Sequence, residues 1–543
     1  MITGISILYL TLLLYLYYGI ITHKFFVAAG RKSWEAFVPL YNFWVTLKII
    51  DRPWWWILLL LLPVVGNVML IIIIYELLHV FRYSKIKHTL LTIVTLGLYL
   101  GYLNYTARLK YEGRDFKEIR KNVSELVASI FFAIVAATVI RAYTFEAFVI
   151  PTPSMEKSLM VGDFLFVSKM HYGSRLPITP LALPLVHNTV PLLNATSYTD
   201  LIQMPIWRLP GFTEVKRNDP FVFNYPVQSE RPIDMRDHYV KRCLATPGDS
   251  LQIIDRKVYI NGKPNDVPDR AVKQTSYYVR TNGVNFNSKL LKKKFDINYL
   301  KSDESGVNDV NLISRDGREF IITIAVDQVE EFSQQPNVQE VIPMNSPISP
   351  KDIPENTPPT LQKVYTSIPD FKPNRNLFPN SRHDDRLMFK WTRDNYGPIY
   401  MPREGDEVEL TPKNLKLYQR IITVYEHNEL EQKQGKVFIN GKPATHYRFK
   451  QNYYWAMGDN RHNSLDSRYW GYVPEDHIVG KPVFIWMSYD RYQGIKGLRT
   501  DRIFTTVNGD GKRFSYFWPF VIVVAGITLY NRRRRKKKDK PAA

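Results

Sequence analysis

The apolar positions of this chain are unevenly spread, since long apolar runs occupy its first 150 residues and one stretch near its end. A helix needs about 20 predominantly apolar residues to cross a lipid bilayer. The runs that approach this length are residues 4–21, 54–80, 89–105, 125–142 and 514–530. The pattern therefore predicts several transmembrane helices. The second of these is expected to be kinked or re-entrant, because Pro63 and Gly66 interrupt it.

The first run has a second interpretation, as a cleaved signal peptide, which needs a basic segment before its apolar part. Met-Ile-Thr precedes the run, so a retained span is the favoured interpretation. Basic residues beside a span mark the cytoplasmic side. By this rule residues 104–124 and 531–543 are cytoplasmic and residues 143–513 lie on the far side. The basic segment 82–88 fits this rule less well, because it would lie outside.

The large region between the spans has a different pattern, with short alternating apolar runs bounded by Gly, Pro, Asn and Asp. This pattern is typical of many strands and turns. VYINGKP at 258–264 recurs as VFINGKP at 437–443, and each copy predicts a hairpin with an Asn-Gly turn. Between them lies a polar insertion, residues 270–434. Its segment 343–379 holds nine prolines, which predicts an extended loop.

Residues 174–216 combine prolines with Leu, Ile, Val and Trp, and a soluble protein rarely exposes such a run. Two interpretations remain open for this segment. It lies against the membrane surface near the anchor at 125–142, or it is a buried core loop.

The net charge of +21 fits a nucleic-acid-binding protein, but eight of its basic residues follow the last apolar run, in Arg532–Lys540. The charge is therefore interpreted as an orientation signal and lipid contact, and no nucleic-acid partner is expected.

Cys243 is the one cysteine, which excludes an internal disulfide and a cysteine-based zinc site. The histidines lack HExxH spacing, so we expect no metal and no cofactor.

Three segments carry candidate chemistry. Ser154 lies in FVIPTPSMEKSLMVGDFLFVSK, between a Thr-Pro turn and an apolar strand, and Lys241 lies in the apolar strand of HYVKRCLATPGD. Burial in such a strand lowers the pKa of a lysine, which a general base at neutral pH requires. The alternative is a structural lysine whose amine reaches out to water. The third segment, AMGDNRHNSLDSRYWGYVPEDHIVGKPVFIWMS at 456–488, is dense in small and polar residues.

In this order and context the three segments strongly resemble type I signal peptidases, the bacterial leader peptidase family. PTPSM resembles the nucleophile box of that family and YVKRCLATPGD its lysine box. GDNRHNSLDSRYWG followed by VPEDHIVGK matches most closely. The likeness covers about 143–260 and 435–490. It implies a mostly β catalytic domain, with Ser154 as the nucleophile and Lys241 as the general base.

The resemblance also implies supporting roles. Ser464 would orient the lysine amine by a hydrogen bond, and Gly458 would leave room for the substrate backbone. The backbone N–H of Ser154 and the hydroxyl of Thr152 would form the oxyanion hole. Threonine at 152 is a departure, because the family usually has serine there. The other matched positions are read as structural, with the last two forming an ion pair behind the lysine: Asp459, Asp466 and Arg468.

Two other functions share part of this sequence pattern. Ser154 and Lys157 form an S-x-x-K motif, as in penicillin-binding proteins and β-lactamases. That interpretation lacks the K-T-G and S-D-N motifs, and Gly162 and the residues after it favour a strand over the required helix. A non-enzymatic or substrate-specialised relative that binds exported proteins is the other alternative. Both Ser154 and Lys241 are present, which argues against an inactive relative.

The sequence therefore predicts a signal peptidase I of the bacterial inner membrane, multi-pass, with a mostly β catalytic domain on the outer side. Its expected partners are preprotein signal peptides, the lipid bilayer and the protein export machinery. The predicted organisation is a multi-span region with a basic loop (1–124), an anchor (125–142), the first catalytic part (143–269), the insertion (270–434), the second catalytic part (435–513), a C-terminal span (514–530) and a basic tail (531–543).

Overall fold

The computed structural model describes residues 4–113, 125–190, 193–284, 286–300, 306–368, 373, 376–380 and 388–538. The chain divides into two compact units. The helical unit comprises Met1–Thr144, Arg175–Leu209 and Arg231–Met235, and the strand unit comprises Phe145–Ser174, Pro210–Glu230 and Arg236–Ala543. Most of the predicted basic loop, residues 114–124, and the last five residues of the tail lie outside the described residues.

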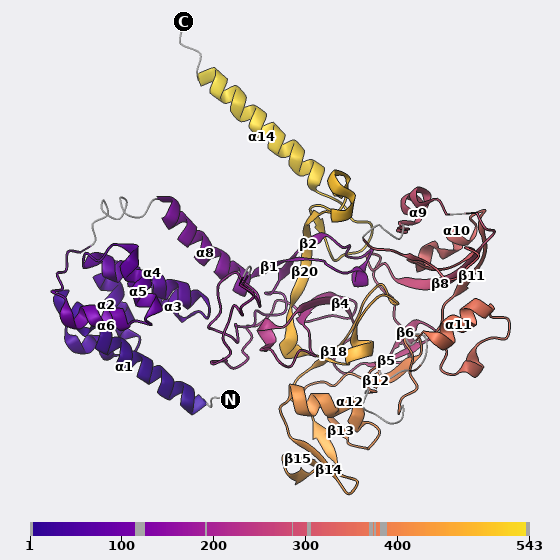
Figure 1. Ribbon diagram of the computed structural model, residues 1–543, viewed down its shortest axis with the longest axis horizontal. Coiled ribbons are helices and arrows are strands. Elements are labelled where there is room, and N and C mark those ends of the chain that lie inside the picture. Colours follow the sequence, from indigo (N-terminus) through magenta and orange to yellow (C-terminus); the bar gives the residue numbers. More distant parts are fainter. Residues whose placement is uncertain are drawn as a thin grey trace. The chain divides into compact units, whose positions relative to one another are not determined.

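The helical unit is built from the apolar runs near the N-terminus (Figure 1). The predicted interruption is present at Pro63, because one helix stops at Leu61 and the next begins at Val65; Gly66 lies within that second helix. Its helices are α1 (Gly4–Ala28), α2 (Tyr41–Ile49), α3 (Trp56–Leu61), α4 (Val65–Val80), α5 (Ile86–Val94), α6 (Leu98–Thr106) and α8 (Glu125–Tyr143), with a 3-10 turn at Ser33–Phe37.

By length and composition, one described helix segment, Thr11–Ala28, is apolar and long enough to cross a membrane. A second candidate is the pair α5 and α6, which is bent by 118°. The prediction of several complete spans is therefore met only in part within the described residues. The physical reason is that breaks divide the second and third apolar runs into short helices, whereas the helix Phe517–Lys538 is basic over its last turns.

The segment Arg175–Leu209 belongs to the helical unit, although the sequence placed it in the catalytic part. Asn67 of α4 donates a hydrogen bond from Nδ2 to the carbonyl oxygen of Pro180 at 2.9 Å. Many apolar side chains of this segment stay exposed, with Leu201 75% and Trp207 60% exposed. The segment is therefore not a buried core loop.

The strand unit confirms the expected mostly β catalytic domain. Its largest sheet has the order β1-β2-β20-β3-β4-β18-β19, and β21 pairs with β20 (Figure 1). The bounds are β1 (Phe145–Val149), β2 (Asp163–Ser168), β20 (Ile478–Ser488), β3 (Pro220–Asn224), β4 (His238–Ala245), β18 (Tyr453–Met457), β19 (Val473–Pro474) and β21 (Thr505–Thr506). Strands from both ends of the catalytic sequence thus meet in one sheet.

Both predicted Asn-Gly hairpins are present. Asn261 and Gly262 have φ of 52° and 77°, and Asn440 and Gly441 have φ of 51° and 76°. Positive φ at both central residues is the geometry that favours Asn-Gly in two-residue hairpins. The strands belong to two smaller sheets, β12 (Tyr396–Tyr400), β5 (Ser250–Ile254), β6 (Lys257–Ile260) and β7 (Lys263–Pro264), and β14 (Leu430–Lys433), β15 (Lys436–Ile439) and β16 (Lys442–Pro443).

Much of the predicted polar insertion folds around apolar cores of its own. Its sheet has the order β11-β8-β10-β9. The elements are β8 (Gln274–Thr281), α9 (Ser288–Phe295), β9 (Val310–Leu312), β10 (Glu319–Ala325), α10 (Val329–Ser333), β11 (Val338–Pro343) and α11 (Pro359–Ser367). The prediction of an extended loop at 343–379 is wrong for α11, because Pro359 occupies the first helical turn, where proline is tolerated.

The last part of the predicted insertion joins the catalytic core instead. Tyr396 and Ile421 pack in one buried cluster with Leu251, Trp455 and Tyr472. The remaining elements are β13 (Glu407–Glu409), α12 (Leu415–Arg420), β17 (His446–Arg448), α13 (Ser467–Trp470) and the C-terminal helix α14 (Phe517–Lys538), drawn in yellow in Figure 1.

Candidate active site

Ser154 lies in a single 3-10 turn, Pro153–Met155, between the edge strand β1 and its neighbour β2. The side chain is 8% exposed. Asn460, from the third motif, holds this turn by two hydrogen bonds. Its backbone N–H donates to the Ser154 carbonyl oxygen at 3.1 Å, and its Nδ2 donates to the Pro153 carbonyl oxygen at 3.3 Å. The turn is therefore fixed by a loop more than 300 residues away along the chain.

Lys241 lies on β4, one of the interior strands of the largest sheet. Its Nζ is 2.7 Å from Ser154 Oγ, and it donates to the Val240 carbonyl oxygen at 3.0 Å. The residue is 3% exposed, so its amine does not reach out to water. The structure thus brings together two of the residues that the sequence singled out, across 87 positions of chain.

Burial lowers the pKa of Lys241 from its ordinary value of 10.5 to about 8. Desolvation disfavours the charged ammonium, and the nearby carboxylates of Asp466 and Asp459 work against that effect. A substantial fraction of the amine is then neutral near pH 8. A neutral amine can accept the proton of the serine hydroxyl, which is the requirement for a general base.

Each of these two carboxylates is paired with an arginine. Arg242 binds Asp459 through Nε at 2.7 Å and Nη2 at 2.5 Å, and Arg468 binds Asp466 through Nε at 2.9 Å and Nη2 at 2.8 Å. All four side chains are buried. The predicted ion pair of Asp466 with Arg468 is therefore present. The guanidinium groups limit how strongly the carboxylates can stabilise the lysine ammonium.

The structure gives a different physical reason for glycine at position 458 than the sequence analysis proposed. A Cβ atom at this position would lie 2.3 Å from Ser464 Oγ and 2.4 Å from the Ser154 carbonyl oxygen. The space is thus filled by the protein itself, and the described residues that line the groove at Ser154 do not include Gly458. The prediction that it leaves room for the substrate backbone is not supported. The glycine permits the close approach of the nucleophile turn.

Ser464 lies beside this glycine, buried and 8% exposed. The described hydrogen bonds of the Lys241 amine do not include Ser464, so the predicted bond from Ser464 to that amine is absent; the Ser464 hydroxyl instead interacts with the carboxylate of Asp466. The reason is positional: Ser464 Oγ lies next to Gly458, and the amine of Lys241 is held by Val240 and Ser154.

A groove of about 530 Å³ opens at Ser154. Thr152 borders it in an extended conformation, exposed, and its hydroxyl does not cap the turn that follows. The other walls are largely apolar, from Phe148, Ile150, Leu165, Val222 and Val240. Because β1 is the edge of the sheet, an extended peptide in this groove could pair with its free backbone edge.

The S-x-x-K alternative fails on geometry. Lys157 has a φ of 69°, and the segment at Ser154 is one 3-10 turn, so the helix that this motif needs is absent here. The amine of Lys157 instead forms an ion pair with Asp296 of the insertion at 2.8 Å. Lys157 thus joins the insertion to the segment after Ser154.

Comparison with known proteins agrees with this geometry. Residues 123–330 and 380–487, more than half of the chain, match the family described as "Signal peptidase, peptidase S26". The chain belongs to that family. Residues 34–114 also match a family of unknown function, DUF5684. Among the described residues no group of three or more His, Cys, Asp or Glu could hold a metal ion.

Curated relatives of the S26 family extend the likeness. The Signal peptidase I of Buchnera aphidicola subsp. Acyrthosiphon pisum is 26% identical over 379 residues, 69% of this chain and 80% of that protein. The Signal peptidase I of Haemophilus influenzae is 24% identical over 389 residues, 71% of this chain and 76% of that protein. The Signal peptidase I of Rickettsia typhi is 33% identical over 151 residues, 28% of this chain and 48% of that protein.

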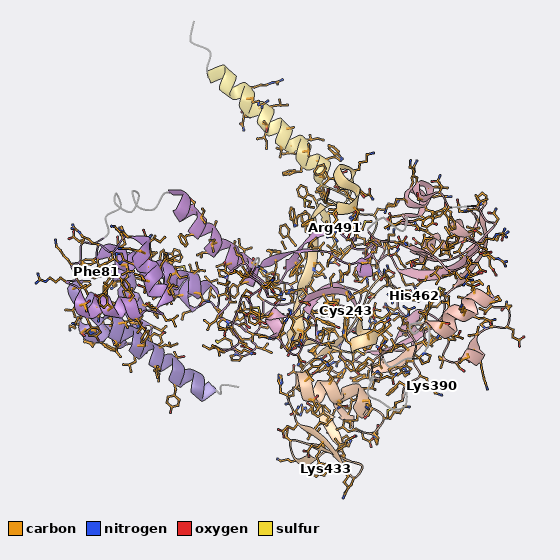
Figure 2. The ribbon with its side chains drawn as sticks, in the orientation of Figure 1. Phe81, Cys243, Lys390, Lys433, His462 and Arg491 are labelled. Atoms are coloured by element: carbon orange, nitrogen blue, oxygen red, sulfur yellow. The ribbon has the colours of Figure 1, made fainter. Side chains whose placement is uncertain are left out.

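Sequence reasoning missed two residues that shape the site. Arg242 directly follows the lysine, and strand alternation places it on the opposite face, where it binds Asp459. Asn460 follows Asp459 and holds the nucleophile turn. The density of polar residues in the third motif was the available signal, but it did not reveal which partners they bind. Figure 2 labels Cys243 and His462, neighbours of these segments in the chain.

Proposed function

We propose that this protein is a membrane-anchored signal peptidase, an endopeptidase that removes signal peptides from exported preproteins using Ser154 and Lys241. The observation that supports the proposal most directly is the 2.7 Å contact between Lys241 Nζ and Ser154 Oγ inside a buried site. The family match and the relatives named Signal peptidase I support the same reaction.

In the proposed mechanism neutral Lys241 accepts the proton of the Ser154 hydroxyl while the serine oxygen attacks the scissile carbonyl carbon. The negative charge that develops on the carbonyl oxygen is stabilised by the Ser154 backbone N–H and the Thr152 hydroxyl. The lysine ammonium then protonates the leaving amine, which departs with the mature protein. Water, activated by the same amine, hydrolyses the ester on Ser154, releases the signal peptide and restores the serine hydroxyl.

The groove suits an extended peptide with small apolar side chains. Its apolar walls come from β1, β2, β3 and β4, and the edge of β1 offers backbone groups for pairing. Ser154 and Lys241 lie in the same groove, so a peptide bound along β1 would present its carbonyl carbon to the serine. We propose a preference for small residues such as alanine before the cut, which the largely apolar walls of the groove would accept.

We further propose that the protein is a multi-pass protein of the inner membrane with its strand unit on the outer side. The candidate span Thr11–Ala28, the bent pair α5 and α6, and the apolar first part of α14 support several spans, as do the basic residues at the end of α14. The exposed apolar side chains of Arg175–Leu209 support contact with lipid, since this segment packs with helices of the same unit. The export machinery is a further proposed partner.

The deciding experiment is cleavage of a purified preprotein in detergent by the wild type, Ser154→Ala and Lys241→Ala. Lys433→Ala is the matched lysine control, because Lys433 is exposed and labelled far from this site in Figure 2. We expect cleavage after an Ala-x-Ala-like sequence by the wild type and the control. Both site variants should lose activity by a factor of at least about 1,000.

Activity that survives in Lys241→Ala would contradict the proposed base. If folded wild-type protein cleaves none of several preproteins, the substrate-specialised alternative gains support. That alternative has a structural basis, because the backbone N–H of Arg461, next to Asn460, donates to the carbonyl oxygen of Gln274 in the insertion at 3.0 Å.

A further inference from the structure

The strand unit contains a second cavity that shares none of its lining residues with the groove at Ser154. Its volume is about 110 Å³, and four arginines line it: Arg217, Arg242, Arg270 and Arg513. One water molecule takes up about 30 Å³ in the liquid, so the cavity has room for a tetrahedral oxyanion. We call it the arginine cavity.

Two of the four arginines are already neutralised by carboxylates. Arg242 is paired with Asp459, and Arg217 donates from Nη2 to Asp249 at 2.7 Å. Arg270 is different, because its guanidinium donates to backbone carbonyl oxygens and a hydroxyl of residues 506–511. These groups accept hydrogen bonds without cancelling the positive charge.

Arg513 is the second unneutralised arginine. Its Nη2 donates to the Ser158 carbonyl oxygen, whereas its Nη1 is buried and has no hydrogen-bond partner among the described residues. Burial lowers the pKa of Arg513 to about 9; the nearby Arg502 and Arg270 add to that effect, and the carboxylate of Asp163, which is itself bound by Arg502, works against it. A buried cation with an unused donor is costly unless a partner supplies an acceptor and an opposite charge.

Two carboxylates also line the arginine cavity. Asp219 is already bound by Lys481 at 2.8 Å and by the hydroxyl of Tyr172 at 3.2 Å. Asp510 is exposed, and its contact with Arg270 is through its backbone carbonyl oxygen at 3.5 Å. The positive charges of Arg270 and Arg513 are therefore without an ion-pair partner in the described part of the chain.

The surroundings of Arg513 suggest where an anion would come from. Exposed aromatic side chains follow it directly, with Phe514 60%, Tyr516 55% and Trp518 58% exposed, and α14 begins at Phe517. Aromatic residues of this kind collect at the level of lipid headgroups. We propose that the arginine cavity binds a phosphate group, carried either by free phosphate or by a phospholipid headgroup beside α14.

The phosphate would accept hydrogen bonds from the guanidinium groups of Arg513 and Arg217, with Arg270 contributing charge. Charge-assisted bonds between arginine and phosphate are among the stronger polar contacts in proteins. Binding would also fix the segment that leads into α14, because Arg270 and Arg513 both hold that segment. Binding of a phospholipid headgroup requires that α14 enters a bilayer, whereas binding of free phosphate does not.

The test uses the full chain, purified in a non-ionic detergent and phosphate-free buffer, and follows its thermal unfolding. One arm adds sodium phosphate at constant ionic strength against chloride, and the other adds phosphatidylglycerol against diacylglycerol, which lacks phosphate. The variants are Arg513→Gln and Arg217→Gln. Arg491→Gln is the matched control, since Arg491, labelled in Figure 2, is exposed and does not line the arginine cavity.

We expect a saturable rise in Tm for the wild type and Arg491→Gln, with apparent affinity weakened about tenfold or more in Arg513→Gln and Arg217→Gln. A response to phosphate and to the phospholipid assigns a general phosphate site. A response to the phospholipid alone assigns a headgroup site.

The proposal is overturned if neither ligand raises the Tm of the wild type, or if all variants respond equally. Should Arg513→Gln not fold, Arg217→Gln still decides the question, because Arg217 is 42% exposed and its removal leaves the buried arginine in place. Since Tm does not depend on peptide cleavage, the outcome is independent of the proposed peptidase activity.

Discussion

At the scale of single residues, Lys241 determines how the proposed reaction depends on pH. Its pKa is lowered by burial to about 8, and only its neutral form can accept the serine proton. We predict that kcat/KM rises about tenfold per pH unit below pH 8 and levels off above it. Initial rates with one preprotein between pH 6 and 10 measure this. A profile that is flat between pH 6 and 8 would contradict the assignment.

The same lowered pKa affects stability in a defined direction. Between about pH 8 and the ordinary value of 10.5, the unfolded chain holds a proton on this lysine that the folded chain has lost. The contribution of Lys241 to the free energy of unfolding therefore increases as pH rises through that window. Below pH 8 the cost of burying the amine is present in full.

Gly458 provides a second prediction at this scale. In Gly458→Ala the added methyl group would collide with Ser464 Oγ and with the Ser154 carbonyl oxygen. Overpacking of this kind costs about 1–3 kcal/mol of stability. It should also displace the nucleophile turn and lower kcat by a factor of about 100 or more. Thermal unfolding and single-turnover cleavage measure the two effects.

Gly526→Ala is the matched control, because an added Cβ there meets nothing within 4 Å. We expect its Tm and kcat to stay close to those of the wild type. A Gly458→Ala protein with normal stability and normal kcat would show that the close approach to Ser154 is not required.

At the scale of elements, the segment Arg175–Leu209 carries the proposed contact with lipid. Cys243 is buried, so a new exposed cysteine can be labelled selectively. We predict that a dye on Leu201→Cys is quenched strongly by lipids that carry a nitroxide near the headgroup. A dye on Leu312→Cys is the control, since Leu312 is 55% exposed on β9 of the insertion. Equal quenching at both positions would contradict the proposed contact of this segment with lipid.

At the scale of the whole molecule, the proposed topology places the strands of the strand unit on the outer side of the membrane. The basic end of α14 would lie on the cytoplasmic side. We predict that an impermeant thiol reagent labels Lys433→Cys in intact spheroplasts. Arg533→Cys should react only in inverted vesicles, because the basic end of α14 is expected to be cytoplasmic. Labelling of Arg533→Cys in sealed, intact spheroplasts would contradict this orientation.

Local patterns in the sequence determined several features of this protein. The apolar runs predicted where helices form, and the interruption at Pro63 is present as a break between α3 and α4. The two Asn-Gly turns were predictable because positive φ at both central residues strongly favours these residue types. The motifs around Ser154 and Lys241 singled out both residues, and the segments that contain them lie within the matched family range.

Only the tertiary structure decided how these residues meet. The 2.7 Å contact of Lys241 with Ser154 depends on strand pairing across 87 residues, and the function of Gly458 depends on which atoms fill the space beside it. The same holds for Arg175–Leu209, which joins the helical unit, and for Tyr396 and Ile421, which join the catalytic core. Turn chemistry and periodicity act over a few residues, whereas packing partners are selected by the shape of the whole fold.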